Sequence, residues 1–559
     1  MTSSIATTPV ALTSRVDQLY PTLAQAQVDR IATHGRRRAV VGGEVLVPSG
    51  QPPSHFFVVV QGRIDVVRTF AATEEVVTSF GPGMFTGEIG LLSGRRGLAE
   101  LRAGAAGELI AVDRDSLLAL IQTDGELSEI LMRAFILRRV ELIARQVGDV
   151  VVLGSPHCQG TLRVKEFLTR NGHPYNSIDL DRDPAAQELL DRFQITAADI
   201  PVVICRCEVV LRNPTNQQIA DCLGFNALID RTQLRDVVVI GAGPAGLAAA
   251  VYAASEGLDV LVVESTAPGG QAGSSSRIEN YLGFPTGVSG QELAARAGVQ
   301  AQKFGAQLMI AEQATKLSCE RTPYAVEIGG GQRIQARTVI IATGAEYRRL
   351  PLEGVARFEG AGVYYAATFM ESQLCEDQEI AIVGAGNSAG QAAVFLAQTA
   401  RRVHLLIRGA GLADTMSRYL IRRIEDHPSI VRHTHTEIVG LEGNGHLERL
   451  AWRNKQTGQT ESHDIRHVFT MTGAVPSTAW LGGCVALDAK GFIKTGPDLT
   501  PEDLGGARWL RARPPHLLET SLPGVFAVGD VRSGNIKRVA SAVGEGSIAI
   551  SAVHQVLAE

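Results

Sequence analysis

The feature that most constrains the fold is a glycine-rich turn between an apolar run and an alanine-rich stretch, VVVIGAGPAGLAAAV at residues 237–251. Gly241 lets the chain turn tightly, Gly243 lets backbone N–H groups approach a pyrophosphate, and Gly246 lets the following helix pack close to the strand. The N-terminus of that helix directs its partial positive charge at the phosphates. Glu264 ends the next apolar run, DVLVVE, where a ribose-binding carboxylate is expected. The pattern predicts a strand–turn–helix unit that binds a dinucleotide.

A second turn of this kind lies in EIAIVGAGNSAGQAAVFLA, residues 379–397. Gly384, Gly386 and Ala389 occupy its fingerprint positions. The next apolar run, RRVHLLIRG, ends with Arg408 in place of an acid. An acid there favours the free ribose hydroxyls of NADH, whereas an arginine accommodates the additional phosphate of NADPH. We therefore expect NADPH as the donor, with NADH as the alternative.

Two nucleotide folds in one chain, the second inserted into the first, predict a flavin together with a nicotinamide. Residues 235–559 closely resemble bacterial thioredoxin reductase and its relatives. The motifs that carry the resemblance are GAGPAG, PGGQAGSSSRIENYLGFP, IIATGAEYRRLP, VGAGNSAG and TSLPGVFAVGDVRSGNIKRVASAVGEGSIAI. The resemblance implies an FAD-binding domain at residues 235–347 and 478–559, and an NAD(P)-binding domain at residues 348–477.

The same resemblance implies roles for individual residues. Gly269, Gly270 and Gln271 would lie along the flavin, with Asn280 near its ring. The other expected cofactor contacts are Thr343 and Gly344 at the crossing between the two domains, Gly529 and Asp530 at the flavin ribitol and pyrophosphate, Lys537, Arg538 and Val539 at the start of the last helix, Pro244 and Ala245 in the first turn, and Asn387 and Ser388 in the second.

One departure from the family bears directly on the chemistry. Thioredoxin reductases carry a CxxC pair in a segment like GVYYAATFMESQ, and the two cysteine positions here are Ala366 and Phe369. Neither side chain can attack a disulfide or take up electrons as a dithiol, because the thiolate is the reactive species. The usual relay from flavin to dithiol is therefore broken, and the electron acceptor is open.

Residues 148–226 resemble the thioredoxin/glutaredoxin fold, with a strand at 149–154, a helix at 161–171, a second strand in YNSIDLD, a second helix in PAAQELLDRFQ and a hairpin in IPVVICRCEVVLRN. Cys158 falls at the first strand-to-helix turn, where that family places its nucleophilic thiol. Thr161 occupies the second CxxC position, so we expect a monothiol site. A cis peptide is expected before Pro201. Cys205 and Cys207 lack partners at zinc-like spacing, and no metal site is expected.

Residues 1–147 read as short alternating strands with glycine turns followed by a helix, and they resemble a cyclic-nucleotide-binding β-barrel of jelly-roll type with flanking helices. The segment FTGEIGLLSGRR resembles the phosphate-binding cassette of that family. The resemblance implies that Gly87 and Glu88 hold the ribose hydroxyl, and that Arg95 or Arg96 holds the cyclic phosphate. Gly97 and Leu98 replace the family's small hydroxyl residue and alanine, so the alternative is an interaction module that binds no nucleotide.

The bulk properties fit a multidomain α/β chain. With 559 residues the sequence needs several domains, and a formal net charge of −5 argues against general nucleic-acid binding. Seven cysteines in so long a chain do not suggest a disulfide framework, and we expect neither a secretory signal nor a membrane span. A cytoplasmic homodimer is expected.

These observations favour an FAD-dependent NAD(P)H oxidoreductase that passes a hydride from NAD(P)H to FAD and then electrons to an acceptor that the sequence does not identify, for which a disulfide reached through Cys158 is one candidate. Two alternatives stay open. One is a ferredoxin-type one-electron reductase, which also lacks CxxC. The other is a flavin-based redox sensor or scaffold with negligible turnover. Its support is the loss of several residues that the related enzymes use for catalysis.

Overall fold

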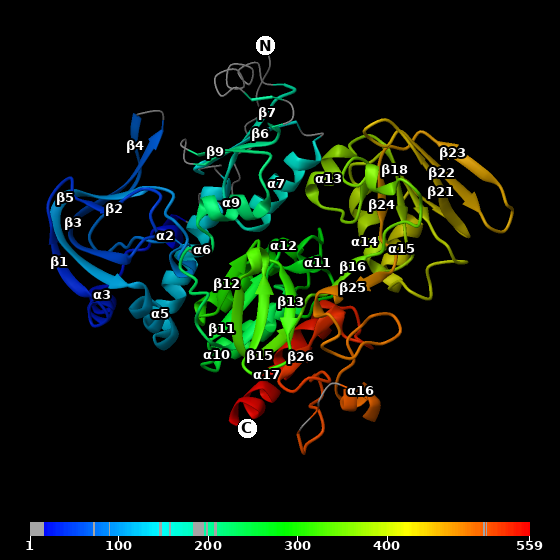
Figure 1. The fold of residues 1–559 in the computed structure, drawn as a ribbon. Coiled ribbons are helices and arrows are strands. Elements are labelled where there is room, and N and C mark those ends of the chain that lie inside the picture. The colour runs from blue at the N-terminus through cyan, green and yellow to red at the C-terminus, as the bar shows by residue number, and fades with distance from the viewer. Residues whose placement is uncertain are drawn as a thin grey trace, which may run out of the picture. The chain divides into compact units, whose positions relative to one another are not determined.

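The computed structural model describes residues 16–70, 73–88, 90–144, 148–155, 158–182, 195–196, 199–205, 209–506, 509 and 511–559. The chain divides into two compact units. One contains residues 1–154, 167–230 and 299–311, and the other contains residues 155–166, 231–298 and 312–559. Figure 1 shows the elements of each unit, coloured along the chain.

The first unit begins with an antiparallel β-structure of jelly-roll type, flanked by helices as expected. Its sheet has the strand order β1-β5-β3-β4, and β2 also pairs with β5. The elements are α2 (Val16–Leu19), α3 (Gln25–Ala32), β1 (Arg36–Val40), β2 (Val45–Val47), β3 (His55–Phe70), β4 (Thr73–Phe80), α4 (Gly90–Ser93), β5 (Glu100–Asp113), α5 (Arg114–Thr123) and α6 (Gly125–Ala144).

Aromatic packing holds this β-structure to its last helix. The rings of Phe56 and Phe85 lie 5.7 Å apart between centroids, and Phe135 of α6 lies 6.2 Å from Phe85 in an edge-on arrangement. All three side chains are fully buried. Such pairs add specificity to apolar burial, so α6 is fixed against the sheet over the cassette.

A four-stranded sheet follows in the first unit, with the order β7-β6-β8-β9. Strands β6 and β7 are parallel, and β8 and β9 form the expected hairpin. The Ile200–Pro201 peptide is cis, as predicted. The predicted helix at 184–194 and Cys207 lie outside the described residues. The elements are β6 (Val150–Gly154), α7 (Gln159–Arg170), β7 (Asn176–Asp179), β8 (Val202–Cys205), β9 (Val209–Arg212) and α9 (Asn216–Leu223). Residues 159–166 of α7 belong to the second unit.

Helix α9 shows how local sequence sets an element here. Thr215 accepts a hydrogen bond from the backbone N–H of Gln218, and the Gln218 side chain accepts one from the N–H of Thr215. This capping box starts the helix, and Gly224 ends it in the left-handed conformation with φ of 67°. Phe225 therefore leaves the helix end in a fixed direction.

The second unit contains a parallel sheet around the first glycine turn. Strand β10 lies between β11 and β15, and β26 returns from the C-terminal part of the chain to pair with β15. Strands β13 and β14 extend the sheet in antiparallel fashion. The elements of this part are β10 (Arg235–Ile240), α10 (Pro244–Ser255), β11 (Val260–Glu264), α11 (Gly270–Gly273), α12 (Gly290–Lys303), β13 (Ala314–Ser318), β14 (Tyr324–Ile328), β15 (Arg333–Ile341), α16 (Pro501–Gly506), β26 (Val525–Ala527) and α17 (Val539–Ala558). Strand β12 (Gln307–Ile310) and residues 299–303 of α12 belong to the first unit.

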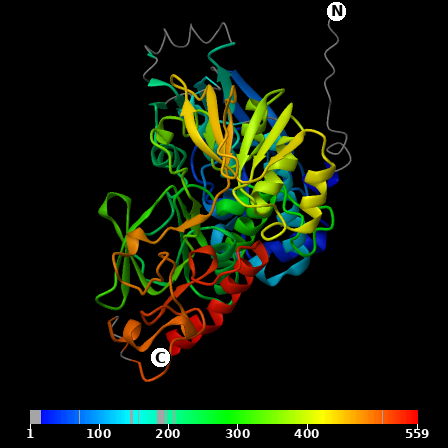
Figure 2. The same ribbon diagram turned by 90° about the vertical axis from the view of Figure 1, so that its right-hand side faces the viewer.

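A second parallel sheet, inserted within the first, has the order β17-β24-β18-β19-β20. A separate three-stranded sheet of β21–β23, yellow to orange in Figures 1 and 2, packs on it through Trp452 and Leu450. The elements are β16 (Ala345–Tyr347), β17 (Val363–Tyr364), α13 (Phe369–Leu374), β18 (Glu379–Val383), α14 (Asn387–Leu396), β19 (Arg402–Leu406), α15 (Arg418–Asp426), β20 (Ile430–His433), β21 (Thr436–Glu442), β22 (Arg449–Asn454), β23 (Thr460–His463), β24 (Val468–Thr470) and β25 (Ala474–Pro476).

Candidate functional site

The first glycine turn has backbone contacts that exclude any side chain. A Cβ on Gly241, whose φ is +102°, would lie 2.4 Å from the carbonyl oxygen of Ala342. A Cβ on Gly246 would lie 1.9 Å from the carbonyl oxygen of Gly241, so α10 and β10 can approach only because this residue is glycine. Pro244 and Ala245 form the first turn of α10.

Two further glycine segments converge on this turn. A Cβ on Gly270 would lie 3.0 Å from the Cα of Gly243, and a Cβ on Gly529 would lie 2.9 Å from the Cβ of Ala245. Gly269 donates its N–H to the carbonyl oxygen of Ala242 at 2.7 Å. Backbone from three distant stretches thus surrounds the N-terminus of α10, which is the environment that a dinucleotide pyrophosphate requires.

Glu264 ends β11 beside this turn and is 8% exposed. One carboxylate oxygen accepts a hydrogen bond from the backbone N–H of Ala242 at 2.7 Å, and the other accepts from Thr266 at 2.9 Å. Hydrogen bonds of this kind hold a carboxylate in place at the edge of the turn. Its position fits the predicted contact with a ribose.

Glu545 of α17 holds the Gly529 segment in place, and sequence reasoning missed it. Its carboxylate accepts hydrogen bonds from the backbone N–H of Gly529 at 2.7 Å and from the side chain of Asn535 at 2.9 Å, and it pairs with Arg532 at 2.5 Å. Burial raises the pKa of the adjacent Asp530, and Lys537 opposes that shift. Arg538 is the N-cap of α17, which begins at Val539.

The two sheets of this unit are joined by a pair of crossing segments. Strands β16 and β25 pair antiparallel, and the Thr343 hydroxyl donates to the carbonyl oxygen of Ser477 at 2.9 Å. Gly344 has φ of +67°, and the Gln271 side chain donates to the carbonyl oxygen of Ala345. The predicted crossing at Thr343 and Gly344 is therefore next to the Gln271 loop. Asn280 lies further along that loop and is exposed.

In the second glycine turn, a Cβ on Gly384 would lie 2.8 Å from the carbonyl oxygen of Met471. Gly386 is the N-cap of α14, and Ala389 is buried behind it. The Asn387 side chain accepts a hydrogen bond from the backbone N–H of Ser417 at 2.7 Å, which fixes the loop that precedes α15. Arg408 follows β19 and is exposed.

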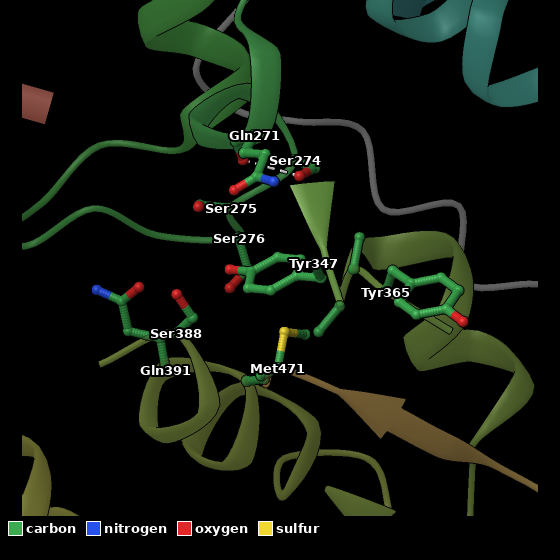
Figure 3. Close-up of a pocket in the computed structure, with 12 residues that line it drawn as sticks. Gln271, Ser274, Ser275, Ser276, Tyr347, Tyr365, Ser388, Gln391 and Met471 are labelled. Atoms are coloured by element: carbon green, nitrogen blue, oxygen red, sulfur yellow. Dashed lines mark hydrogen bonds between the residues drawn. The ribbon is translucent and has the colours of Figure 1, made fainter. Parts of the chain in front are cut away.

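A small cavity of about 50 Å³ lies between the loop that begins at Gln271 and the start of α14, which follows the second glycine turn (Figure 3). Tyr347 lies between the serines that follow Gln271 and the start of α14, with Ser388 on its hydroxyl side. Burial raises the pKa of Tyr347, and a hydrogen bond with Ser388 opposes that shift. The remaining lining residues are Ser274, Ser275, Ser276, Tyr365, Ala366, Ala367, Gln391, Ala392 and Met471.

Ala366, at the first position of the lost CxxC pair, therefore lines the same cavity as Gln271. Its neighbour Tyr365 donates its hydroxyl hydrogen to Glu359 at 2.7 Å. Tyr347, Tyr365 and Met471 had no signal in the sequence that distinguished them from core residues. The cavity wall holds aromatic and alanine side chains where the family places a dithiol.

Cys158 directly precedes α7 and is partly buried. Its N–H donates to the carbonyl oxygen of Ser155, and its own carbonyl accepts from Leu162, both at 3.1 Å. Burial lowers the pKa of Arg163, one turn further along, and the nearby Cys158 opposes that shift. A Cβ on Gly360 would lie 2.7 Å from the side chain of Gln159, so the residue next to Cys158 packs on the segment that leads to Ala366.

The cysteines were expected to form no disulfide framework, and the structure corrects this expectation at one pair. Cys319 and Cys484 form a disulfide with Cα atoms 5.9 Å apart, across a sequence separation of 165 residues. Cys375 is a fully buried thiol, and burial raises its pKa to about 12. No spacing rule identifies a pair so far apart in sequence, because only the folded sheet brings β13 and the 484 segment together.

In the cassette of the first unit, Arg138 donates to the carbonyl oxygen of Gly87 at 2.8 Å, and Arg139 pairs with the carboxylate of Glu88 at 3.4 Å. Arg95 donates to the carbonyl oxygen of Asn171 at 2.7 Å. Burial lowers the pKa of Arg95 to about 10. The predicted effector residues are thus together, but they contact the chain itself.

Comparison with known proteins identifies the family to which this arrangement belongs. A model of the pyridine nucleotide-disulphide oxidoreductase family matches residues 235–546, and a cyclic nucleotide-binding domain model matches residues 37–124. The chain belongs to the pyridine nucleotide-disulphide oxidoreductase family.

Within that family the chain is a thioredoxin reductase-like oxidoreductase, a group that uses FAD and NADPH. It is 34% identical over 326 residues to a thioredoxin reductase of Mycolicibacterium smegmatis, covering 58% of this chain and 97% of that one. It is 32% identical over 318 residues to a thioredoxin reductase of Ureaplasma parvum, covering 57% of this chain and 95% of that one. The crystal structure of T. acidophilum thioredoxin reductase superimposes with a TM-score of 0.52 at 26% identity, covering 59% of this chain and all of that one.

None of the described helices is both long and apolar enough to cross a membrane.

Proposed function

We propose that this protein is an NADPH-dependent flavoprotein that reduces a disulfide through Cys158. The observation that carries the proposal is the packing of Gln159, next to Cys158, on Gly360. Gly360 lies six residues before Ala366, which lines the cavity together with Gln271 and Ser388. The start of α7, next to the Cys158 thiol, therefore packs on the segment in which the family's dithiol is replaced.

Electrostatics around α13 support the same pairing of segments. Burial raises the pKa of Glu371, and the charge of Glu166 on α7 acts in the same direction. The charge of Glu166 on α7 is therefore near enough to act on Glu371 of α13, and both residues belong to the unit that contains Gln159 and Gly360.

The thiol step is a disulfide exchange. The Cys158 thiolate attacks one sulfur of the substrate disulfide, a new S–S bond forms, and the second substrate sulfur leaves as a thiol. Glutathione or another thiol then resolves the mixed disulfide, releasing the remaining substrate sulfur and leaving Cys158 in a disulfide with the resolving thiol. Return of Cys158 to the thiol takes two electrons and two protons, and the electron pair comes from NADPH.

A bound FAD would supply hydride-transfer chemistry between the nicotinamide and the next electron acceptor. The glycine cradle, the ordered carboxylate of Glu264 and the start of α17 fit that cofactor. We propose that the FAD contacts are Gly241, Gly243, Pro244, Ala245, Gly246, Glu264, Gly269, Gly270, Gln271, Asn280, Thr343, Gly344, Gly529, Asp530, Lys537, Arg538 and Val539. We propose that the NADPH contacts are Gly384, Gly386, Asn387, Ser388, Ala389 and Arg408.

The domain boundaries predicted above, the glutaredoxin-like character of residues 148–226, a homodimer and a cytoplasmic setting belong to the same proposal. The partners are a nicotinamide dinucleotide, a disulfide substrate and a cyclic nucleotide at the cassette. A ferredoxin-type reductase is the second candidate, favoured by the alanine at position 366 in the cavity wall.

The test compares Cys158→Ser with the wild type and with Cys375→Ala, which removes a buried thiol elsewhere. Each purified holoprotein is assayed for NADPH-dependent reduction of glutathione disulfide and insulin disulfides, and for reduction of ferricyanide and ferredoxin. We expect Cys158→Ser to lose disulfide reduction at least tenfold while ferricyanide reduction is kept. Disulfide reduction that is unchanged in Cys158→Ser contradicts the relay, and strong ferredoxin reduction without disulfide reduction favours the second candidate.

A further inference from the structure

Two cassette arginines, Arg95 and Arg96, and Arg139 of α6 contact the ends of two helices whose C-terminal ends lie in the same unit. Arg95 donates to the carbonyl oxygen of Asn171 at 2.7 Å, and Arg139 donates to that of Gly172 at 2.8 Å. Arg96 donates to the carbonyl oxygen of Cys222 at 3.4 Å. Asn171 and Gly172 directly follow α7, and Cys222 lies in the last turn of α9. Three guanidinium groups are thus directed at two helix C-termini.

A helix C-terminus carries partial negative charge, because its last carbonyl groups lack partners within the helix and its peptide dipoles are aligned. Arginine is the residue best suited to an anionic group with several acceptor oxygens. The carbonyl oxygens at the ends of α7 and α9 therefore offer the cassette the same kind of acceptor as the oxygens of a phosphate.

Phe225 completes the contact with an aromatic ring. The guanidinium carbon of Arg95 lies 4.3 Å from the centroid of this ring, and the Phe225 side chain is 5% exposed. The rings of Phe167 and His173 lie 6.1 and 5.8 Å from it, so its position is fixed on three sides. A guanidinium that stacks on a buried ring is held by cation–π attraction as well as by its hydrogen bond.

The rest of the cassette is engaged in the same way. A Cβ on Gly94 would lie 2.3 Å from the side chain of Leu228, so the turn before Arg95 is covered by the segment that follows Phe225. A Cβ on Gly224 would lie 2.5 Å from the Nε of Arg96. Glu88, the predicted ribose contact, pairs with Arg139 instead.

We propose that the ends of α7 and α9, together with Phe225, occupy the cassette in place of a ligand, and that cyclic-nucleotide binding and this internal docking exclude one another. The ligand's phosphate and the helix-end carbonyls require the same guanidinium groups. The proposal rests on nucleotide binding at the cassette and does not depend on electron transfer through Cys158.

The test measures binding of fluorescent cyclic AMP and cyclic GMP analogues to the full-length holoprotein by anisotropy. Phe225→Ala removes the ring, and Phe225→Leu keeps apolar volume but loses the aromatic face. Phe304→Ala is the matched control, since Phe304 is a partly buried phenylalanine that contacts Lys303. We expect at least tenfold tighter binding of one analogue in Phe225→Ala than in the wild type or Phe304→Ala, a smaller gain in Phe225→Leu, and loss of binding in Phe225→Ala/Arg95→Ala.

Hydrogen exchange supplies the second readout. The nucleotide that binds is expected to increase amide exchange in α9 of the wild type at saturating concentration. Equal affinity in wild type and Phe225→Ala, or no binding to Phe225→Ala with its flavin content intact, overturns the proposal. Either result leaves the reductase proposal untouched, because NADPH oxidation is measured separately on the same samples.

Discussion

The Arg95 guanidinium carbon lies 4.3 Å from the centroid of the Phe225 ring, although 130 residues separate the two in sequence. This contact joins a cassette typical of nucleotide-binding barrels to the end of α9. The same arginine donates to the carbonyl oxygen of Asn171. A side chain predicted to bind an external ligand thus binds groups of the chain itself.

His173 makes the stability of this contact dependent on pH. It is 6% exposed, its Nε2 lies 3.1 Å from Asp149, and its ring packs on Phe225. Burial lowers the pKa of His173, and the charges of Arg139 and Arg95 act in the same direction, whereas Asp149 opposes them. The folded-state pKa therefore lies below the unfolded value of about 6.5.

Below about pH 6.5 the unfolded chain takes up a proton that the folded chain does not, so the free energy of unfolding falls as the pH falls toward the folded-state pKa. We expect a loss of up to about 1.4 kcal/mol per pH unit in this window, and no contribution from His173 above it. Urea unfolding of the wild type, His173→Gln and the exposed control His446→Gln at pH 7.5 and 5.5 measures this. An equal pH response in His173→Gln and wild type would show that His173 does not carry the effect.

Glu264 is expected to hold the flavin. Glu264→Gln loses the charge while keeping similar volume, and hydrogen bonds to a charged group contribute about 1.5–3 kcal/mol each. We expect FAD affinity to fall at least tenfold, measured by flavin absorbance after gel filtration and by titration of the apoprotein. Glu256→Gln is the control, because Glu256 is an exposed partner of His554. Full flavin occupancy and unchanged affinity in Glu264→Gln would remove this residue from the site.

Arg408 is expected to select the donor. Its exposed guanidinium after β19 suits the additional phosphate of NADPH. Arg408→Glu should lower kcat/KM for NADPH at least tenfold, with little change for NADH, in a ferricyanide assay that bypasses the disulfide step. Arg402→Glu, also exposed on β19, is the charge-matched control. If both nucleotides respond equally to Arg408→Glu, the residue does not contact that phosphate.

The sequence predicts best what depends on local spacing. Gly241 and Gly246 belong to one short motif that requires glycine at both positions. The motif therefore predicts that a Cβ at either position would lie too close to the backbone, and the structure gives distances of 2.4 and 1.9 Å to the nearest carbonyl oxygen. The chain crossing at Thr343 likewise follows from a motif, and the structure pairs it with Ser477. Family resemblance gave the inserted order of the two domains.

Long-range contacts could not be predicted in this way. Glu545 supports the Gly529 turn from the middle of α17, where an acid in a helix has no special spacing. The disulfide between Cys319 and Cys484, and the contact of Arg95 with Phe225, depend on how separate elements pack. Side-chain periodicity reports which face is buried and gives no information on what covers it.

We propose above all that electrons enter this chain from NADPH at a bound flavin. The most direct measurement is anaerobic titration of the purified holoprotein with NADPH and then NADH, following flavin absorbance by stopped flow. We predict bleaching by NADPH within about a second and slower bleaching by NADH, on the basis of Arg408 and typical turnover rates. No bleaching by either nucleotide over minutes would contradict the claim, and a flavin-based sensor or scaffold would then be the better account.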